Sequence, residues 1–438
     1  MVCTLSMVPP AESARIADSV SATGRASWCF VGSPPGVRQG WKLYVSANNG
    51  NFAQVLDAIH PILARHAMPY KHAADQRVLQ RINAGLDGYS QVGKAIVVYI
   101  DDDSRALPLL DDLKVALQPF VHSAVLPPFA EPVGGGLPLS YRYGAFEGDQ
   151  IAIGGVTIAD DRTRKMSALD GLPADPFAPA VAPAAPDEGL RKLLLRFPVF
   201  EVLSQSGKGG VYAAMDLGSP VFREVILKIG RRNGNLLPDG RDAMDLVRRE
   251  KWFFDTATAH GLAQYVPVVA GYWEFPSSAV LIMERIEGET LQNTRARDAL
   301  KIEHIRASMK ILEAFHAQGL IAGDAKLGNF ILTPSEALKI IDFESGGFIH
   351  EAQGCDQYST FLFTDRRLEC HPAAREKLHF LYSAVHDEGE GAFDEASRLI
   401  DLSAVIAAPP RSDLAAATLA LMREIFGDHC REGEQKFN

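Results

Sequence analysis

A proline-rich segment divides this chain of 438 residues into two parts. Residues 171–189, GLPADPFAPAVAPAAPDEG, contain five prolines among alanines. Each proline fixes φ and removes a backbone N–H donor, so the stretch cannot continue a helix or a central strand. We therefore predict a semi-rigid linker over 166–190, one folded domain over 1–165 and another over 191–438. With 47% hydrophobic residues, both parts can bury a core.

The composition disfavours several classes of protein. The formal net charge of −10 argues against nucleic acid and anionic membranes as main partners, which leaves peptides or small molecules as ligands. Five cysteines without a C-x-x-C pair are typical of a reducing compartment. The N-terminus lacks the pattern of a signal peptide, and no apolar run approaches ~18 residues. The sequence thus predicts a cytoplasmic protein with no nucleic-acid or membrane partner.

Hydrophobic periodicity predicts an α+β fold for the first part. The β-rich runs 41–47 and 94–100 enclose the stretch 52–68, whose apolar residues recur at helical spacing. A second helical stretch follows over 107–120. The order strand, helix, strand, helix indicates a compact α+β domain.

The second part changes from strands to helices along its length. The pattern predicts a hairpin pair at 211–217 and 223–230. It also predicts a helix that ends at glycine over 242–261 and a buried strand over 279–286. From about residue 299 onward, helical patterns predominate. A sheet-rich lobe over about 191–286, followed by a helix-rich lobe over about 287–438, is the order of a bilobal protein-kinase-like domain.

The stretch IAGDAKLGNFIL, residues 321–332, contains residue types that phosphoryl transfer needs. Asp324 and Asn329 form D-x-x-x-x-N, which resembles the catalytic loop of protein kinases. Asp342 comes 13 residues after Asn329, at the end of the apolar strand LKII. By this resemblance Asp324 and Lys326 are catalytic. Asn329 and Asp342 are the expected oxygen ligands of Mg²⁺.

The nucleotide-binding residues are expected in the sheet-rich lobe. Lys228 ends VILK, the place of the strand lysine that binds nucleotide phosphates in protein kinases. Glu250, 22 residues later in the predicted helix, is the candidate partner of Lys228. The other candidates for cofactor contacts are Gly207, Gly209, Gly210, Glu284 and Ile286. ATP and Mg²⁺ are the expected cofactors, although a plain hairpin turn explains the glycines equally well.

Two departures from the protein-kinase pattern bear on regulation and on the acceptor. Ala322 and Gly323 stand where His-Arg precedes the catalytic aspartate, and Glu344 replaces the glycine of D-F-G. The histidine mostly packs the loop, whereas the arginine usually holds an activation-loop phosphate, so activation by loop phosphorylation is less expected. The same letters also fit aminoglycoside and choline kinases, so this part leaves the acceptor open between a peptide and a small molecule.

Five short motifs in the first part carry a second resemblance: WKLYVSA, PYKHAADQ, GKAIVVY, YIDDD and YRYGAF. Together with the kinase-like part, they resemble the class III lanthipeptide synthetases, whose lyase and kinase domains precede a cyclase. The resemblance implies that the kinase phosphorylates Ser or Thr of a precursor peptide. It implies further that a phosphothreonine-lyase-like domain removes the phosphate to leave dehydroalanine or dehydrobutyrine. We expect no cyclase here, and hence a separate cyclase or other modifying enzyme as a possible partner.

The resemblance also assigns lyase residues. Elimination needs a base for the Cα proton, an acid for the leaving phosphate, and cations that hold it. By resemblance Lys71 is the base, Lys42 and Arg142 hold the phosphate, and Lys94 is a further candidate. Tyr44 stands where the family pattern W-K-x-H has the proposed acid. On a strand, Tyr44 shares a face with Lys42, but an unperturbed tyrosine pKa near ~10 suits neutral pH less well than histidine.

The sequence therefore predicts an enzyme, a transferase and lyase that uses ATP and Mg²⁺ to dehydrate Ser or Thr of a precursor peptide. Three alternatives stay open: a peptide kinase whose first domain only binds phosphopeptide, a small-molecule kinase, and a nucleotide-binding pseudoenzyme. His72 is not assigned, because its side chain should point away from that of its neighbour Lys71. Cys370 and His371 receive no metal, because they lie within the kinase-like part.

Overall fold

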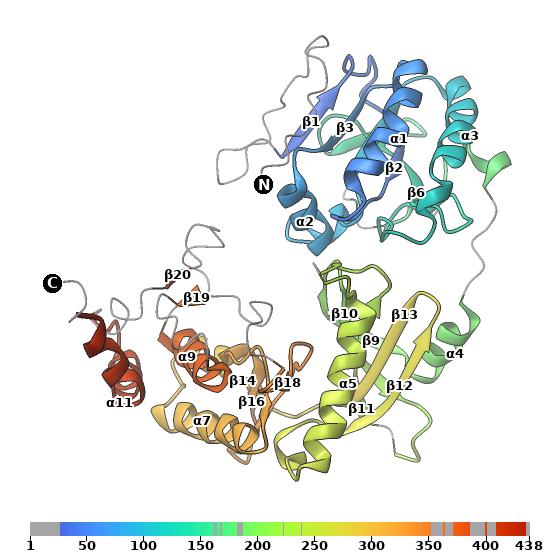
Figure 1. Cartoon of the computed structure of the whole chain (residues 1–438). Helices are drawn as coiled ribbons and strands as arrows, with labels where there is room; N and C mark the ends of the chain where they lie inside the picture. Colours follow the sequence, from blue (N-terminus) through green and yellow to red (C-terminus); the bar gives the residue numbers. More distant parts are fainter. Residues whose placement is uncertain are drawn as a thin grey trace. The chain divides into compact units, whose positions relative to one another are not determined.

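The computed structural model describes most of the chain (Figure 1). The described residues are 27–160, 162, 164–166, 169–181, 187–221, 223–237, 239–351, 362–363, 371–385, 399–400 and 409–434. The chain forms two compact units. The first comprises Met1–Tyr212, Lys228–Met244 and Glu274–Ala279, and the second comprises Ala213–Leu227, Asp245–Trp273 and Val280–Asn438. Among the described residues, no helix has both the length and the apolar character needed to cross a membrane.

A six-stranded antiparallel sheet lies at the centre of the N-terminal region, in the order β1-β3-β4-β2-β6-β5 (Figure 1). In chain order, β1 to β6 are Trp28–Val31, Gln39–Val45, Tyr70–Ala73, Ile96–Ile100, Glu131–Pro132 and Leu139–Ala145. The two expected β-rich runs thus become β2 and β4. These two strands lie side by side at the centre of the sheet.

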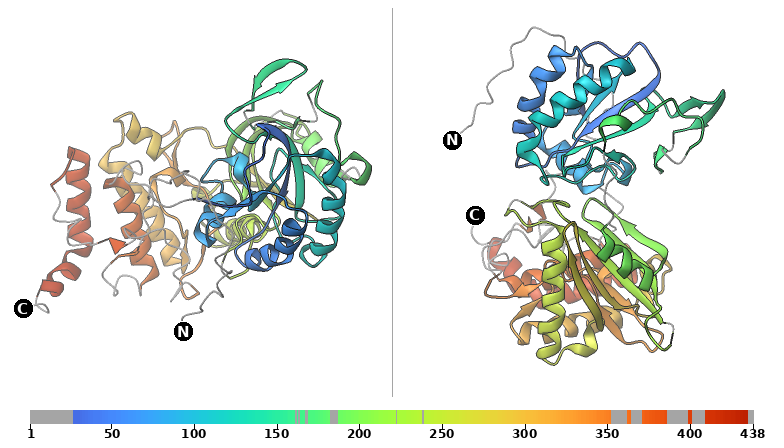
Figure 2. Two further views of the ribbon diagram at one scale, coloured as in Figure 1. Left: turned by 90° about the horizontal axis from the view of Figure 1, so that it is seen from above. Right: turned by 90° about the vertical axis from the view of Figure 1, so that its right-hand side faces the viewer.

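Three helices pack against one face of this sheet (Figure 2). They are α1 (Phe52–Arg65), α2 (Gln76–Ala84) and α3 (Ala106–Ala116). The two-residue period of β2 directs Trp41, Leu43 and Val45 into the buried core beneath these helices. Lys42 and Tyr44 consequently lie on the opposite face of the sheet, and that face carries the candidate site.

The proline-rich segment is more than a spacer, which the sequence did not indicate. Phe177 is fully buried, with its ring 4.7 Å from that of Tyr141 and 6.0 Å from that of Trp41. The Tyr141 hydroxyl donates a hydrogen bond to Asp175 at 2.9 Å. Closely spaced prolines disfavour long helices and strands, but they do not prevent a neighbouring aromatic ring from entering a core. This part of the segment is therefore fixed to the N-terminal sheet.

The next region contains a five-stranded sheet in the order β12-β13-β11-β10-β9. In chain order, β9 to β13 are Val199–Gln205, Gly209–Asp216, Arg223–Arg231, Val269–Phe275 and Ser278–Glu284. Helix α4 (Glu188–Arg196) precedes the sheet, and helix α5 (Ala243–Ala259) follows β11. The predicted hairpin pair appears as the neighbouring strands β10 and β11.

The C-terminal region is rich in helices. Its helices are α6 (Leu291–Ala296), α7 (Ile302–Ala317), α9 (Pro372–Val385) and α11 (Asp413–Glu434). Its short strands include β14 (Glu289–Thr290), β15 (Leu320–Ile321), β16 (Phe330–Leu332), β17 (Leu338–Ile340) and β18 (Gly347–Phe348). Phe343 packs into a cluster of rings, 4.4 Å from Phe253 and 5.8 Å from Phe315. This cluster fixes the chain immediately after Asp342.

Candidate active sites

The predicted lyase residues lie on the sheet face opposite helices α1 to α3. Strand β2 carries Lys42 and Tyr44, and in the register Lys42 is opposite Arg142 of β6. Val97 of β4 lies opposite both Tyr44 and Lys71 of β3. These three neighbouring pairings place side chains from four strands on one surface. The sequence motifs, far apart along the chain, therefore meet in the fold.

The lysines on this face are buried, and burial changes their acidity. Burial, followed by the charge of Arg162, lowers the pKa of Lys42 to about 7, although Asp160 opposes the shift. The same two causes lower the pKa of Lys71 to about 8. Burial and the charge of Lys42 hold the pKa of Lys94 well below its usual range. A lysine with a pKa near neutrality can accept a proton at physiological pH.

Aromatic rings surround two of these ammonium groups. The Nζ atom of Lys71 lies 4.4 Å from the ring centroid of Trp28 and 5.6 Å from that of Phe30. The Nζ atom of Lys94 lies 5.1 Å from the ring centroid of Tyr44. An aromatic face attracts a cation without neutralising its charge. The rings therefore pack against the Lys71 and Lys94 amino groups without placing a negative charge beside them.

Two residues that the sequence analysis missed contribute to this face. Both follow the hairpin of β7 (Gln150–Ile153) and β8 (Val156–Ala159). The buried carboxylate of Asp160 accepts hydrogen bonds from Arg142 at 2.5 Å and from the Ala145 N–H at 3.0 Å. Burial raises the pKa of Asp160, but the hydrogen bond and charge of Arg142 outweigh it, so the pKa lies below its usual range. No motif or strand period marks Asp160 or Arg162 in the sequence.

Two buried polar atoms on this face have no hydrogen-bond partner among the described residues. They are Nε of Arg142 and Oγ of Ser140, which lies opposite Tyr44 in the register. Leaving a buried donor unsatisfied costs about 1–3 kcal/mol. An anion that accepts from both atoms would remove this cost. Phosphate suits such a site, because its oxygens accept hydrogen bonds from arginine, lysine and hydroxyl donors.

Tyr44 occupies the position of the family histidine. Burial raises its pKa to about 12, against the opposing charge of Arg142. Its phenol therefore keeps its proton at neutral pH and can donate it or a hydrogen bond. His72 lies elsewhere, as expected: its ring is 6.2 Å from Phe52 of α1, and its Nδ1 hydrogen-bonds the Ala73 carbonyl at 2.8 Å.

The loop from residue 321 to 332 holds its polar side chains together. Asn329 Nδ2 donates to the Asp324 carbonyl at 2.7 Å and lies 3.4 Å from its carboxylate oxygen Oδ2. The Nζ atom of Lys326 lies 2.9 Å from the same oxygen. The three residues singled out from D-x-K-x-x-N thus form one cluster. Its carboxylate is partly exposed, as a group that meets a substrate must be.

Asn329 and Asp342 fit the expected metal in residue type and placement. The Ile341 N–H donates to the Asn329 carbonyl at 2.8 Å, and Phe330 pairs with Ile340 across β16 and β17. Because Asn329 uses its Nδ2 toward Asp324, its Oδ1 is the atom that can face a cation. An amide oxygen and a carboxylate are ligands that Mg²⁺ accepts. Among the described residues, no group of three or more His, Cys, Asp or Glu side chains could hold a metal ion. Cys370 lies outside the described residues.

Helix α9 orients the loop that lacks the usual histidine and arginine. The Gly323 N–H donates to Glu376 Oε1 at 2.6 Å, and Glu376 Oε2 lies 2.7 Å from His316 Nε2. Gly323 has φ +88°, and a Cβ there would lie 2.2 Å from the Ser345 carbonyl oxygen. The position therefore requires glycine. No sequence pattern marks Glu376, which is far from the loop along the chain.

Glu250 contacts the segment that follows Asp342. It is buried in α5, and its Oε1 accepts a hydrogen bond from the Phe343 N–H at 3.1 Å. The carboxylate therefore fixes the backbone beside the candidate metal ligand. Lys228 belongs to the first unit and Glu250 to the second, so their predicted ion pair stays a prediction.

The glycine-rich turn uses its glycines for close backbone contacts. The Gly207 N–H donates to the Ala84 carbonyl at the end of α2 at 3.1 Å, and a Cβ on Gly207 would lie 1.5 Å from the Asn83 carbonyl oxygen. Gly209 has φ +148°, and a Cβ there would lie 1.8 Å from the Ile229 carbonyl oxygen. Both positions therefore exclude any side chain.

The remaining predicted cofactor residues are buried or half-buried. Gly210 is buried in β10, and Ile286 is half-buried just after β13. The Glu284 carboxylate accepts hydrogen bonds from the Val268 N–H at 3.1 Å and from Lys339 Nζ at 2.9 Å. The Glu284 N–H donates to the Val268 carbonyl at 2.8 Å, so both the backbone and the side chain of Glu284 are held by neighbouring residues.

Comparisons with known proteins agree with the resemblance. Residues 10–165 match the RamC N-terminal domain, and residues 250–363 match the ABC1 atypical kinase-like domain. A probable SapB synthase of Streptomyces coelicolor is 26% identical over 347 residues, which cover 72% of this chain and 36% of that protein. The chain thus spans about a third of the length of this curated relative. With its mixed helices and sheets, its match to the RamC N-terminal domain and its kinase-like domain, the chain is similar to the class III lanthipeptide synthetases that its motifs resemble.

Proposed function

We propose that this chain modifies a precursor peptide in two steps. It phosphorylates Ser or Thr with ATP, and it then eliminates the phosphate to leave dehydroalanine or dehydrobutyrine. The observation that carries the proposal is the buried cationic face, where Arg142 Nε and Ser140 Oγ lack partners among the described residues. A phosphate bound there would come from the product of a kinase, and the same chain contains a kinase-like domain.

In the proposed kinase step, Asp324 orients the acceptor hydroxyl toward the γ-phosphate. Lys326, 2.9 Å from the Asp324 carboxylate, contributes positive charge beside the transferred group. Lys228 binds nucleotide phosphates, and Asn329 with Asp342 would hold Mg²⁺. When bound, the metal ion neutralises charge on the phosphates. Glu376 acts through the backbone, because it fixes Gly323 immediately before Asp324.

In the proposed elimination, the neutral amine of Lys71 takes the Cα proton. The electron pair of the Cα–H bond forms the Cα=Cβ bond, and the Cβ–O bond breaks with its electrons moving to the phosphate oxygen. Tyr44 supplies the proton to the leaving phosphate, while Arg142, Lys42 and Lys94 hold it. The low pKa of Lys71, about 8, supports its role as a base.

The test uses the full chain with ATP, Mg²⁺ and a short Ser/Thr-rich peptide encoded beside it, followed by intact mass. We expect a phosphorylated intermediate and then a net loss of one water per modified residue. Asp324→Asn should abolish phosphorylation, and Lys71→Met should leave the phosphopeptide as the final product. A wild-type reaction that ends at the phosphopeptide would exclude the lyase step.

The presence of Tyr44 also favours a second candidate, a peptide kinase whose first domain only binds phosphopeptide. A group with a pKa of about 12 is a weaker acid at neutral pH than histidine. A synthetic phosphothreonine peptide separates the two functions without ATP. Release of inorganic phosphate supports the lyase, whereas binding without release supports the second candidate.

A further inference from the structure

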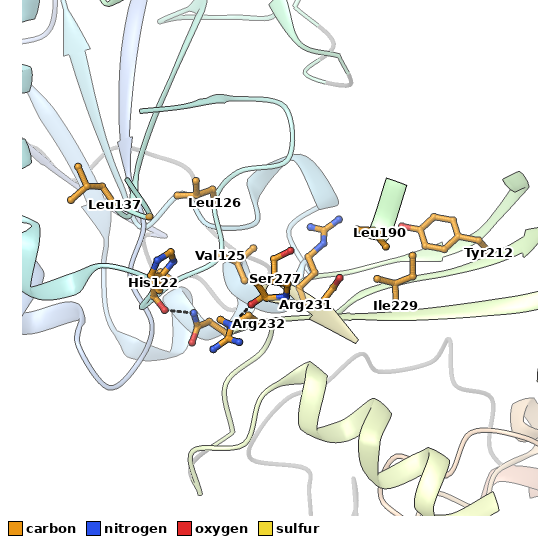
Figure 3. Close-up of a pocket in the computed structure, with 15 residues that line it drawn as sticks. His122, Val125, Leu126, Leu137, Leu190, Tyr212, Ile229, Arg231, Arg232 and Ser277 are labelled. Carbon is orange, nitrogen blue, oxygen red and sulfur yellow. Dashed lines mark hydrogen bonds between the residues drawn. The ribbon is translucent and has the colours of Figure 1, made fainter. Parts of the chain in front are cut away.

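A cavity lies within the first unit, and its lining residues include none of the predicted lyase residues. Its volume is about 500 Å³, within the range of ligand-binding pockets (Figure 3). One wall comes from the loops after α3 and before β6, and includes His122, Leu126 and Leu137. The other wall comes from the ends of β11 and β13, and includes Arg231, Arg232 and Ser277. The cavity is thus built by the RamC-type domain and the five-stranded sheet together.

Direct contacts hold these two walls together. The Asn233 side chain donates to the His122 carbonyl at 2.6 Å. Arg231 donates to the Tyr89 hydroxyl, and its guanidinium lies 5.3 Å from the centroid of that ring. All these residues belong to the first unit. The cavity is therefore a feature of one compact body.

The cavity combines positive charge with apolar surface. None of its fifteen lining residues is acidic, whereas Arg231 and Arg232 are cationic. Each guanidinium has five N–H donors, and the hydrogen bonds to Tyr89 and to the Pro276 carbonyl use one on each arginine. Val125 and Leu126 supply apolar wall beside these groups. This chemistry suits a carboxylate that is flanked by apolar side chains.

An independent observation indicates that a polar ligand belongs here. Ser278 lines the cavity and is 4% exposed, yet its Oγ has no hydrogen-bond partner among the described residues. A buried hydroxyl normally has a partner, because an unsatisfied one costs about 1–3 kcal/mol. A peptide carbonyl or carboxylate in the cavity would accept its proton.

We propose that this cavity docks an acidic, partly apolar segment of the peptide substrate, apart from the Ser or Thr that reacts. The proposal rests on the proposed two-step function. One peptide that must visit two active sites gains from an anchor, because tethering converts the second encounter into an intramolecular one. Walls from both the RamC-type domain and the five-stranded sheet suit an anchor that serves both steps.

The test measures binding of the fluorescein-labelled, unmodified substrate peptide to the full chain by anisotropy, without ATP. A second peptide carries Asn and Gln in place of every Asp and Glu. Arg232→Glu reverses an exposed charge at the cavity, and Val125→Trp fills it. Lys310→Glu, an exposed charge reversal on α7, is the matched control, because Lys310 does not line the cavity.

We expect both cavity variants to weaken binding at least about tenfold, the control to bind like wild type, and the Asn/Gln peptide to bind weakly to wild type. Equal binding by Arg232→Glu, Val125→Trp and wild type would overturn the proposal, as would a peptide that the wild type modifies without measurable binding. A peptide that binds in this pattern but is never modified would support the docking site while removing the two-step function. The two proposals therefore fail separately.

Discussion

Tyr44 stands where the family pattern has histidine, so the proposed lyase activity depends on whether Tyr44 can donate a proton to the leaving phosphate. Tyr44 is buried between Lys94 and the Arg142–Asp160 pair, and its pKa of about 12 keeps it protonated. We predict that Tyr44→Phe slows elimination from a synthetic phosphothreonine peptide about 10²-fold, the lower end for loss of a general acid. Phosphorylation should be unchanged. Tyr44→His is the control and should eliminate at least as fast as wild type; equal rates for Tyr44→Phe and wild type would remove Tyr44 as the acid.

The pH dependence of elimination should follow Lys71. Only its neutral amine can take the Cα proton, and its pKa is about 8. The kcat should therefore rise about tenfold per pH unit below that pKa and level off above it. Tyr44, with a pKa of about 12, should add no falling limb up to pH ~9. Initial rates at saturating phosphopeptide test this, and a rate that does not rise between pH ~6 and ~8 would contradict Lys71 as the base.

Residues inside regular strands were predictable, and residues outside them were not. The period of two placed Lys42 and Tyr44 on one face, and the register then brought Arg142 opposite Lys42. Asp160 and Arg162 follow the hairpin of β7 and β8, and no periodic sequence pattern predicts where their side chains lie. Glu376 contacts Gly323 only because α9 packs near the loop, a tertiary fact with no local signature.

At the scale of elements, the conformation of the proposed catalytic loop depends on the backbone of Gly323. We predict that Gly323→Ala lowers ATP-dependent phosphorylation at least tenfold, because a Cβ would lie 2.2 Å from the Ser345 carbonyl oxygen and φ is +88°. Gly319→Ala is a matched control, since Gly319 has φ +74° but no atom within 4 Å of the added Cβ. Elimination from synthetic phosphopeptide should be unaffected in both variants. Similar phosphorylation rates for the two variants would show that the close approach to Ser345 is unimportant.

The order of helices and strands followed from hydrophobic periodicity, whereas the proline-rich segment has a role in the fold that was not predicted. The strands and helices expected in both parts appear near their predicted positions, because long periodic runs report burial on one face. The proline-rich segment was expected only to separate domains. The segment contains the 3-10 helix Ala178–Ala180 and the start of α4 at Glu188, so the expectation of no regular helix was only partly right. Burial of Phe177 depends on the space that Trp41 and Tyr141 leave, which no local pattern encodes.

At the scale of the whole molecule, the contact between α2 and the glycine-rich turn links the two proposed activities. The C-terminal carbonyls of a helix lack intrahelical partners, and the Ala84 carbonyl accepts the Gly207 N–H at 3.1 Å. Arg231, the last residue of the neighbouring strand β11, donates a hydrogen bond to Tyr89 of the RamC-type domain. If this turn covers nucleotide phosphates, as proposed, it takes its position partly from the RamC-type domain.

This linkage predicts that a substitution in the RamC-type domain changes the kinase. Tyr89→Phe removes the hydroxyl that accepts from Arg231, and Gly207→Ala places a Cβ 1.5 Å from the Asn83 carbonyl oxygen. We expect the KM for ATP to rise about fivefold in the first variant and at least tenfold in the second, because a hydrogen bond contributes about 1 kcal/mol and a backbone clash costs more. Gly36→Ala, with no atom within 4 Å of its added Cβ, should leave that KM unchanged. Hydrogen exchange at the Gly207 amide should accelerate in Tyr89→Phe. If that amide and the KM for ATP both match wild type, the turn is positioned by its own hairpin, and the two activities are independent.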